Sequence, residues 1–303
     1  SWEALPGNCP CILSPDRSVH GLVYLPADGS VKTQRVDVVI PVFHGLWGED
    51  GTVQGLLKLA GIPFVGCDVL ASAACMDKAV ACALFEAAGV PHCPWASFTQ
   101  YQLESDLDSC CEQLEYKLGY PMFVKPANAG SSVGITKVMD RYGLRTGIEL
   151  ALREDTKLVF EAAVDGQEVE CAVLGSDPAL ATCPGEILAG AEFYTYDDKY
   201  KNGVSQVVIP ARLSEEKQAE VSALARKAYT ALGCEGLARC DFFVEKTTGR
   251  VLINEINTFP GFTPISMYPK LMEHTGLPVP ELIDELIALA MDRAARAKEK
   301  NHG

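Results

Sequence analysis

Residues 237–261, LARCDFFVEKTTGRVLINEINTFPG, predict the element that decides the fold, a β-hairpin. Two runs rich in aromatic and β-branched residues are separated by TTG, which favours a reversal of the chain. Side chains alternate between the two faces of a strand. Arg239 and Asp241 therefore share one face of the first strand, and Glu255 and Asn257 share one face of the second. Such charged residues need an explanation, because burying an unpaired carboxylate costs on the order of several kcal/mol.

The oxygen atoms of this predicted face suit a magnesium ion. Mg²⁺ binds few protein carboxylates and completes its coordination shell with water and substrate phosphate. Asp241, Glu255 and Asn257 are therefore candidate metal ligands. The alternative is a solvent-exposed face that carries an Arg–Asp ion pair, and this stretch alone leaves both interpretations open.

The composition excludes several classes of function. The 303 residues are 48% hydrophobic and 22% charged, which is typical of a globular chain long enough for two or three domains. A net charge of −14 argues against binding to nucleic acid or to an anionic membrane surface. No apolar run has the roughly 18 residues of a membrane span and the start does not resemble a signal peptide, so we expect a cytoplasmic location. The 12 cysteines lack a CxxC pair, which favours reduced, mostly buried thiols over a zinc site.

The order of the predicted elements indicates an α/β chain built from mixed α+β modules. The first 35 residues are rich in turns, and VDVVIPVF (36–43) predicts a strand buried on both faces. Asp68 is expected to cap a helical stretch that breaks near Met76 and ends at Gly89. Further strands are predicted at 62–66, 97–101, 120–125, 135–138, 157–162, 168–175, 179–188 and 206–210, and helices over 52–61, 104–118, 142–153, 214–232 and 278–300.

Residues 126–134, PANAGSSVG, are a candidate phosphate-binding loop. Small residues between two strands let backbone N–H groups line a concavity, and Lys125 and Lys78 supply two ammonium groups. No GxxxxGK[ST] or GxGxxG motif is present, so ATP would bind outside the P-loop and Rossmann schemes. A flexible hairpin loop with surface lysines is the alternative.

Three other stretches could contribute to a ligand site. HGLWGEDGTVQG (44–55) follows a predicted strand, where ligands gather in α/β sheets, although His44 could equally be an ordinary loop histidine. Glu161 and Glu168 flank a turn and could accept hydrogen bonds from an amine or ribose, although exposed turn glutamates are common. The polar stretch 191–205 could close over a site as a mobile lid or simply be a solvated charged loop.

Taken together, a series of motifs in this order resembles the D-alanine–D-alanine ligases of the ATP-grasp superfamily. The motifs are HGLWGEDGTVQG, MDK, FVKPANAGSSVGITKV, FEAAVDGQEVECAVLG, KY, ARCDFF and INEINTFPGFTPISMYP. The resemblance covers roughly residues 36–290 and implies an ATP-grasp fold. It further implies a partial N-terminal α/β domain (1–75), a central ATP-grasp module (76–166) and a C-terminal module with the metal-binding hairpin (167–303).

The resemblance also implies a role for individual residues. Lys78 and Lys125 would hold ATP phosphates, with Glu161 and Val164 at the adenine and Glu168 at the ribose. The remaining implied contacts are Lys199 at the γ-phosphate, Ser132 and Asn254 at the nucleotide, Ser131 and Tyr200 in a lid network, Arg239 and the Gly261 N–H as oxyanion hole, His44, Ser266 and Met267 at the amino acids, and Asp241, Glu255 and Asn257 on two Mg²⁺ or Mn²⁺ ions.

The chain departs from the family at its start. The family opens with a strand and a glycine-rich loop whose glutamate grips the first substrate, and nothing before Ser1 supplies them, so a truncation by several tens of residues is expected. The resemblance implies joining of two D-alanines for peptidoglycan by a homodimer. Two segments, NCPCILSPDRSVHG and SSVGITKV, look closest to the D-serine-type vancomycin-resistance ligases. A D-serine product, a D-lactate product and an inactive nucleotide-binding form therefore stay open as alternatives.

Overall fold

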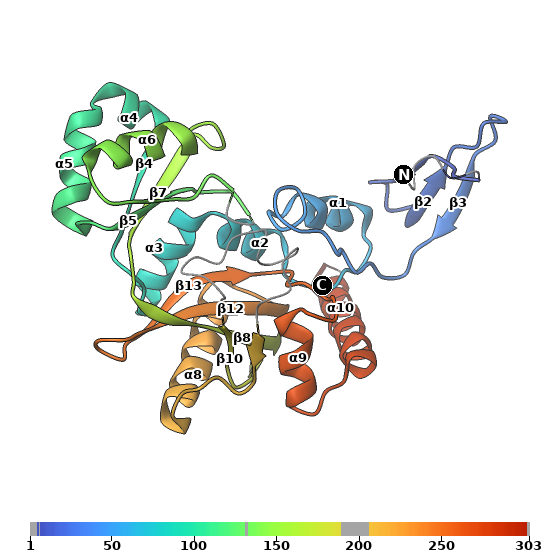
Figure 1. Ribbon diagram of the computed structural model, residues 1–303. Coiled ribbons are helices and arrows are strands. Elements are labelled where there is room, and N and C mark those ends of the chain that lie inside the picture. The colour runs from blue at the N-terminus through green and yellow to red at the C-terminus, as the bar shows by residue number, and fades with distance from the viewer. Residues whose placement is uncertain (1–4, 6, 131–132, 189–205, 302–303) are drawn as a thin grey trace.

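Three antiparallel sheets organise the chain (Figure 1). The computed structural model describes residues 5, 7–130, 133–188 and 206–301. The largest sheet has the strand order β11-β10-β8-β12-β13, and β9 pairs with β8. Its strands are β8 (Gly166–Gly175), β9 (Leu180–Ala181), β10 (Gly185–Leu188), β11 (Gln206–Val208), β12 (Gly236–Glu245) and β13 (Val251–Asn257). The last two form the predicted hairpin, which is confirmed.

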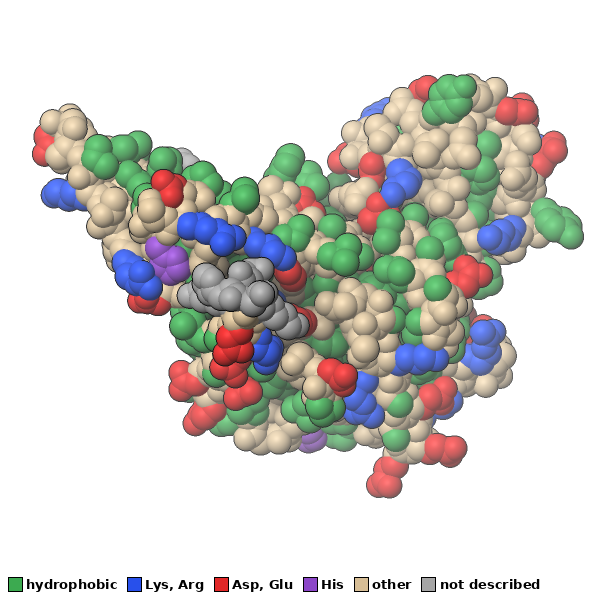
Figure 2. Space-filling view, turned by 180° about the vertical axis from the view of Figure 1, so that it is seen from behind, with side chains coloured by type: hydrophobic (Ala, Val, Ile, Leu, Met, Phe, Trp, Pro, Cys, Tyr) green, Lys and Arg blue, Asp and Glu red, His purple; other side chains and the backbone are tan. Residues whose placement is uncertain are grey.

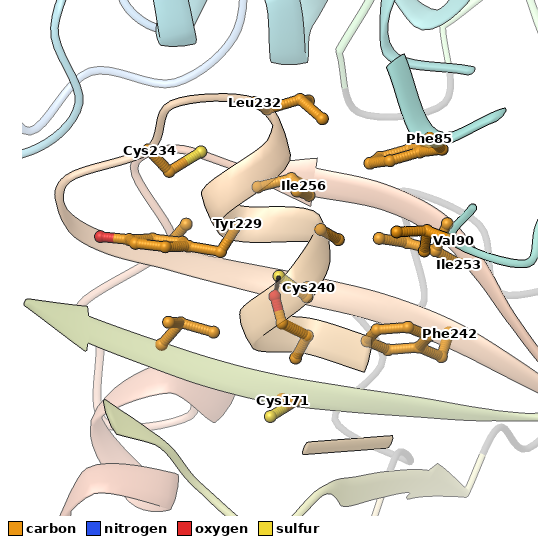
Figure 3. Packing of buried hydrophobic residues seen from close by; sticks show 14 of the residues in the cluster. Phe85, Val90, Cys171, Tyr229, Leu232, Cys234, Cys240, Phe242, Ile253 and Ile256 are labelled. Carbon is orange, nitrogen blue, oxygen red and sulfur yellow. Dashed lines mark hydrogen bonds between the residues drawn. The ribbon is translucent and has the colours of Figure 1, made fainter. Parts of the chain in front are cut away.

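One face of the largest sheet packs on an apolar core. Phe242 of β12 and Ile253 of β13 lie against α8 (Glu215–Ala231), whose Tyr229 is buried in the same cluster (Figure 3). The helices α2 (Val69–Met76) and α3 (Lys78–Ala88) contribute Cys75 and Phe85 to it. This core holds β12 and β13 in place from the apolar face of the sheet.

The opposite face of the sheet changes character along the strands. At one end, Leu174 and Leu237 pack with α9 (Met267–His274) and α10 (Val279–Asn301). Further along the same strands, the alternation of side chains brings Glu170, Arg239 and Asp241 to this face. The charged half of the face is therefore built on strands that are anchored in apolar cores.

A smaller sheet with the order β4-β7-β5-β6 forms the central part of the chain. Its elements are β4 (Trp95–Thr99), α4 (Gln100–Ser105), α5 (Leu107–Leu118), β5 (Met122–Pro126), β6 (Thr136–Val138), α6 (Arg141–Ala151) and β7 (Lys157–Ala162). The single helix predicted over 104–118 is wrong in its start. The chain breaks at Asp106, whose side chain accepts a hydrogen bond from Ser109 N and so begins a second helix.

The predicted break in the helical stretch before this sheet is confirmed. The Asp68 side chain accepts a hydrogen bond from Val69 N at the start of α2, and α2 ends at Met76. Asp77 then caps α3 by accepting from Ala79 N and Val80 N. Because Asp77 both follows the last residue of α2 and caps α3, the chain stops one helix and starts the next at a single residue.

The N-terminal part differs most from expectation. β1 (Cys11–Leu13), β2 (Gly21–Tyr24) and β3 (Lys32–Arg35) form a third sheet, which projects from the rest, where only turns were expected (Figure 1). The strands predicted at 36–43 and 62–66 are wrong: the described chain holds only an isolated parallel bridge between Val39 and Phe64 there. Val42 and Phe43 are each 55% exposed, so this apolar run is not a strand buried on both faces.

The helix predicted over 52–61 is present as α1 (Thr52–Ala60), which contacts α2. Seen from behind, a hollow separates the projecting N-terminal part from the lobe that contains the four-stranded sheet (Figure 2). Within the parts that the structure describes, no helix is both long and apolar enough to cross a membrane. The cysteines are free thiols, and nine of them are buried, as the sequence predicts.

Candidate active site

The register of the hairpin places the predicted metal ligands side by side. Asp241 lies directly opposite Glu255, and Arg239 lies directly opposite Asn257. The register shifts after Asp241, because Phe242 pairs with Ile253 and leaves the intervening Asn254 without an opposite residue. This β-bulge keeps Glu255 on the face of Asp241 while Ile253 reaches the core.

Arg239 is the cation of this face. Its Nε donates to Asp241 Oδ1 and its Nη2 to Asp241 Oδ2, each at 2.7 Å, and Nε lies 3.0 Å from Glu170 Oε2. Burial alone would lower the pKa of Arg239, but Asp241 and Glu170 raise it well above its ordinary value. The Arg–Asp pair considered from the sequence therefore exists, yet the two side chains are only 18% and 14% exposed. It is a largely buried pair, not a solvated one.

The oxygen set fits a magnesium or manganese ion. Asn257 Nδ2 donates to Asp241 Oδ2 at 2.9 Å, which directs the amide beside the carboxylates. Among residues that the structure describes, no group of three His, Cys, Asp or Glu side chains could hold a metal. Two carboxylates and an amide oxygen leave coordination positions for water and phosphate, as Mg²⁺ prefers. The metal assignment of Asp241, Glu255 and Asn257 stays a prediction.

Two buried lysines lie on the neighbouring elements. Lys125 of β5 forms an ion pair with Glu161 of β7, and their side chains are 11% and 6% exposed. Burial would lower the pKa of Lys125, but the carboxylate of Glu161 raises it overall. Lys78 begins α3 and donates from Nζ to Ala129 O at 2.7 Å, while burial lowers its pKa. The structure thus brings two ammonium groups to the predicted phosphate loop.

The described part of that loop is anchored at its base. Asn128 donates from both N and Nδ2 to Asp155 Oδ2, at 2.8 and 3.0 Å. Lys78 N donates to Ala127 O at 3.0 Å, so the loop is attached to the start of α3 as well. These contacts fix where the loop leaves β5, and the sequence motif did not reveal Asn128 or Asp155.

Several predicted contacts remain untested. Glu168 is exposed on β8 opposite Phe243, and Val164 lies in the connection between β7 and β8. Ser131, Ser132, Lys199 and Tyr200, and the predicted lid at 191–205, lie outside the described residues.

The loop from His44 to Asp50 reaches the end of the hairpin through Glu49. Glu49 Oε2 accepts from Gly45 N at 2.6 Å, and Oε1 accepts from Phe259 N at 3.3 Å. Burial raises the pKa of this carboxyl group, and the hydrogen bond from Gly45 opposes the shift. His44 itself is exposed. Sequence reasoning missed Glu49 because its partner Phe259 is 210 positions away.

The segment after β13 is tightly packed. A Cβ added to Gly261 would lie 2.7 Å from Ser266 Oγ, so only glycine fits without movement. Ser266 Oγ accepts from Thr263 N at 3.0 Å at the start of α9. Met267 is only 4% exposed and belongs to the core cluster under α9, so a contact with substrate through its side chain stays a prediction.

Comparison with known proteins places these residues in a family. The model of the D-ala D-ala ligase C-terminus matches residues 84–288, and that of the N-terminus matches residues 18–67. A D-alanine–D-alanine ligase of Acetivibrio thermocellus is 52% identical over 267 residues, which cover 88% of this chain and 71% of that protein. One of Caldicellulosiruptor bescii is 49% identical over 288 residues, covering 95% and 79%.

Solved structures agree with the sequence relatives. The VanG D-Ala:D-Ser ligase from Enterococcus faecalis superposes with a TM-score of 0.85 at 40% identity, covering 95% of this chain and 81% of that one. The D-alanine–D-alanine ligase from Coxiella burnetii gives 0.80 at 36% identity, covering 89% and 72%. The fold is thus the mixed α/β ATP-grasp fold, and the chain belongs to the D-alanine–D-alanine ligase family.

Proposed function

We propose that this chain joins two D-alanines to D-alanyl-D-alanine at the expense of ATP, through an acyl phosphate, for cytoplasmic synthesis of peptidoglycan precursors. The observation that carries the proposal is the pairing register, which sets Asp241, Glu255 and Arg239 together on one sheet face. Identities of 52% and 49% to enzymes of this name support it. A homodimer is part of the proposal, by analogy with the family.

The first step is transfer of the γ-phosphoryl group. A carboxylate oxygen of the first D-alanine attacks the γ-phosphorus, and the bond to the β–γ bridging oxygen breaks to release ADP. In-line transfer needs positioning and charge neutralisation more than a protein nucleophile. Lys78 and Lys125 supply ammonium groups for the phosphates. Two Mg²⁺ or Mn²⁺ ions, held by Asp241, Glu255 and Asn257, would supply further neutralisation and orient the phosphates.

The second step forms the peptide bond. The amine of the second amino acid attacks the carbonyl carbon of the acyl phosphate, loses a proton, and inorganic phosphate leaves. Negative charge develops on the carbonyl oxygen, and Arg239 with the Gly261 N–H is proposed to stabilise it. A preorganised donor of this kind contributes roughly 3–4 kcal/mol.

The second substrate is proposed to be D-alanine. Met267 is apolar and offers no hydrogen-bond partner to a serine hydroxyl, and burying such a hydroxyl unpaired costs roughly 1–3 kcal/mol. We infer that a lid lysine and tyrosine suit an amino acid rather than D-lactate. The structural similarity to the VanG D-Ala:D-Ser ligase makes D-alanyl-D-serine the competing product.

The test is a competition between equal concentrations of D-alanine, D-serine and D-lactate with ATP, with products separated by mass. We expect D-alanyl-D-alanine to dominate; a majority of D-alanyl-D-serine would assign the chain to the alternative. Phosphate release with D-alanine, and with no amino acid, separates an active ligase from a nucleotide-binding form without turnover.

A further inference from the structure

Glu170 lies beside Asp241 and Arg239, and the proposed reaction gives it no role so far. It lies on β8 directly opposite Asp241 of β12, which in turn lies directly opposite Glu255 of β13. Directly opposite residues have Cβ atoms about 5 Å apart, so three carboxylates form a row across three strands. Like charges so placed repel one another unless a cation lies among them.

Arg239 joins two members of this row. Its Nε contacts both Asp241 Oδ1 at 2.7 Å and Glu170 Oε2 at 3.0 Å, and its Nη2 contacts Asp241 Oδ2 at 2.7 Å. The Glu170 and Arg239 side chains are only 12% and 18% exposed. Water therefore competes weakly for these contacts, and the guanidinium is held from two strands.

The proposed reaction makes competing demands on Asp241. Both of its oxygens accept hydrogen bonds from Arg239, yet a metal ligand must offer an oxygen to the ion. A bound ion would draw on the charge of Asp241 and so would weaken its pair with Arg239. The guanidinium must nevertheless stay in place for the second step, since a misplacement of about 1 Å can cost about 100-fold in rate.

We propose that Glu170 is a positioning residue that holds the guanidinium of Arg239 toward the reacting carbonyl when Asp241 binds metal. This inference rests on the proposed ligase function. Glu170 suits the task because β8 is an internal strand, paired with β10 on one side and β12 on the other, which fixes the origin of its side chain. It acts through Arg239 and needs no contact with substrate.

The first test is Glu170→Gln, which keeps the size of the side chain and removes its charge. We expect kcat to fall about tenfold, a part of the effect of losing an oxyanion donor outright. At saturating Mg²⁺ the KM for ATP should stay within about twofold, because Lys78 and Lys125 and not Arg239 meet the phosphates. Asp165→Asn is the matched control: it makes the same change in charge at a 75% exposed residue of the turn before β8, and it should leave kcat unchanged. A normal kcat in Glu170→Gln overturns the proposal.

A double-mutant cycle separates positioning from a direct effect of charge. In an Arg239→Ala background, Glu170→Gln should lower kcat little further, because the residue through which it acts is gone. An equal loss in both backgrounds would overturn the proposal. Circular dichroism and thermal melting check folding; should Glu170→Gln not fold, Glu170→Asp keeps the charge, withdraws it from Arg239 by one methylene, and should also lower kcat.

Binding of Mn²⁺ gives a readout independent of turnover. Titration by electron paramagnetic resonance in the presence of ADP should show weaker Mn²⁺ binding in Glu170→Gln, because Arg239 then pairs with Asp241 alone and competes with the ion more strongly. The weakening should be smaller in the Arg239→Ala background, and an equal weakening would count against the proposal. If the wild-type chain makes no dipeptide, the ligase function fails while the Mn²⁺ titrations still decide the role of Glu170.

Discussion

Asp241 and Glu255 are the residues whose charge the proposed chemistry uses most directly. Asp241→Asn and Glu255→Gln should each lower turnover at least about 100-fold, since each removes one of two carboxylates that would bind metal. The fold should survive, because both substitutions keep the side-chain shape, and in Asp241→Asn the charge of Arg239 is still paired with Glu170.

The measurement is ADP release at limiting and at saturating Mg²⁺, with thermal melting as the check on folding. Glu220→Gln, on α8 and remote from this face, is a suitable control for the change in charge. Full activity of either variant at limiting Mg²⁺ would rule out the metal assignment.

Lys78 should make nucleotide binding depend on pH. Its pKa in the free protein is lowered by burial from 10.5, whereas bound phosphates favour the charged form. Between the lowered pKa and 10.5, the complex therefore holds more protons than the free protein, and the affinity for ATP should fall as pH rises through this window. Calorimetry in buffers of different ionisation enthalpy should detect the proton uptake. Lys78→Arg, which stays charged, should abolish it; equal uptake in both proteins would contradict the assignment.

At the residue scale, the sequence was informative where a signal is local. The period of two placed Arg239 with Asp241, and Glu255 with Asn257, on one face of each strand, whereas the register decides that the two pairs share a face. The same period relates Glu168 to Glu170 in the run EVE and could have revealed Glu170. Glu49 had no such signal. Its contact with the hairpin is a hydrogen bond from Phe259 N, and only folding brings these two distant residues together.

The loop between β5 and β6 is the element whose anchoring can be tested. Asp155→Ala removes the acceptor for Asn128 N and Nδ2 and for Lys157 N. The KM for ATP should rise roughly fivefold, the equivalent of about 1 kcal/mol for a loop that must be ordered again on binding. The KM for D-alanine should change less. Glu112→Ala, exposed on α5, is the control, and an unchanged KM for ATP in Asp155→Ala would refute the anchoring role.

Helices whose ends are marked by capping residues could be predicted from the sequence. A strand exists only where a neighbouring strand pairs with it, so an apolar run alone does not establish one. Asp68 and Gly89 mark the ends of a helical stretch by their own chemistry. The apolar run at 36–43 carries no information about whether strands flank it, and in this structure it is mostly loop. The helix α9 escaped notice because Pro269 suggests a break, although proline is tolerated in the first turn, where its missing N–H is not needed.

At the scale of the whole molecule, Arg293 connects the C-terminal helix to the N-terminal part. It donates to Gly66 O and Phe64 O, each at 2.6 Å, and its guanidinium lies 4.5 Å from the centre of the Phe64 ring. Arg293→Ala should lower the free energy of unfolding by about 2–4 kcal/mol, because two carbonyls of buried residues lose charged donors. Urea denaturation measures this. Arg296→Ala, exposed one turn further on, should cost much less, and equal losses would show that the contact contributes little.

The global arrangement followed from the family resemblance more than from the pattern of residues. Periodicity yields strands and helices one at a time, whereas the core under the large sheet joins α2 and α3 to strands far along the chain, as Ala71 and Ile256 of one cluster show. The resemblance supplied this long-range information because relatives with the same motifs share one fold, and the superposition on solved structures agrees with it.

The bulge at Asn254 determines which insertions and deletions this hairpin can accept during evolution. Ile253 and Ile256 both face the core although they are three positions apart, an odd spacing that a regular strand cannot accommodate. The extra residue shifts the alternation of side chains between the half of β13 that packs in the core and the half that carries the proposed metal ligands. Loss of Asn254 would leave Glu255 and Asn257 on the charged face and Ile256 in the core, whereas one further residue inserted there, with the bulge kept, would exchange the two faces. Position 254 can therefore lose a residue, but cannot gain one, without an exchange of the two faces of β13.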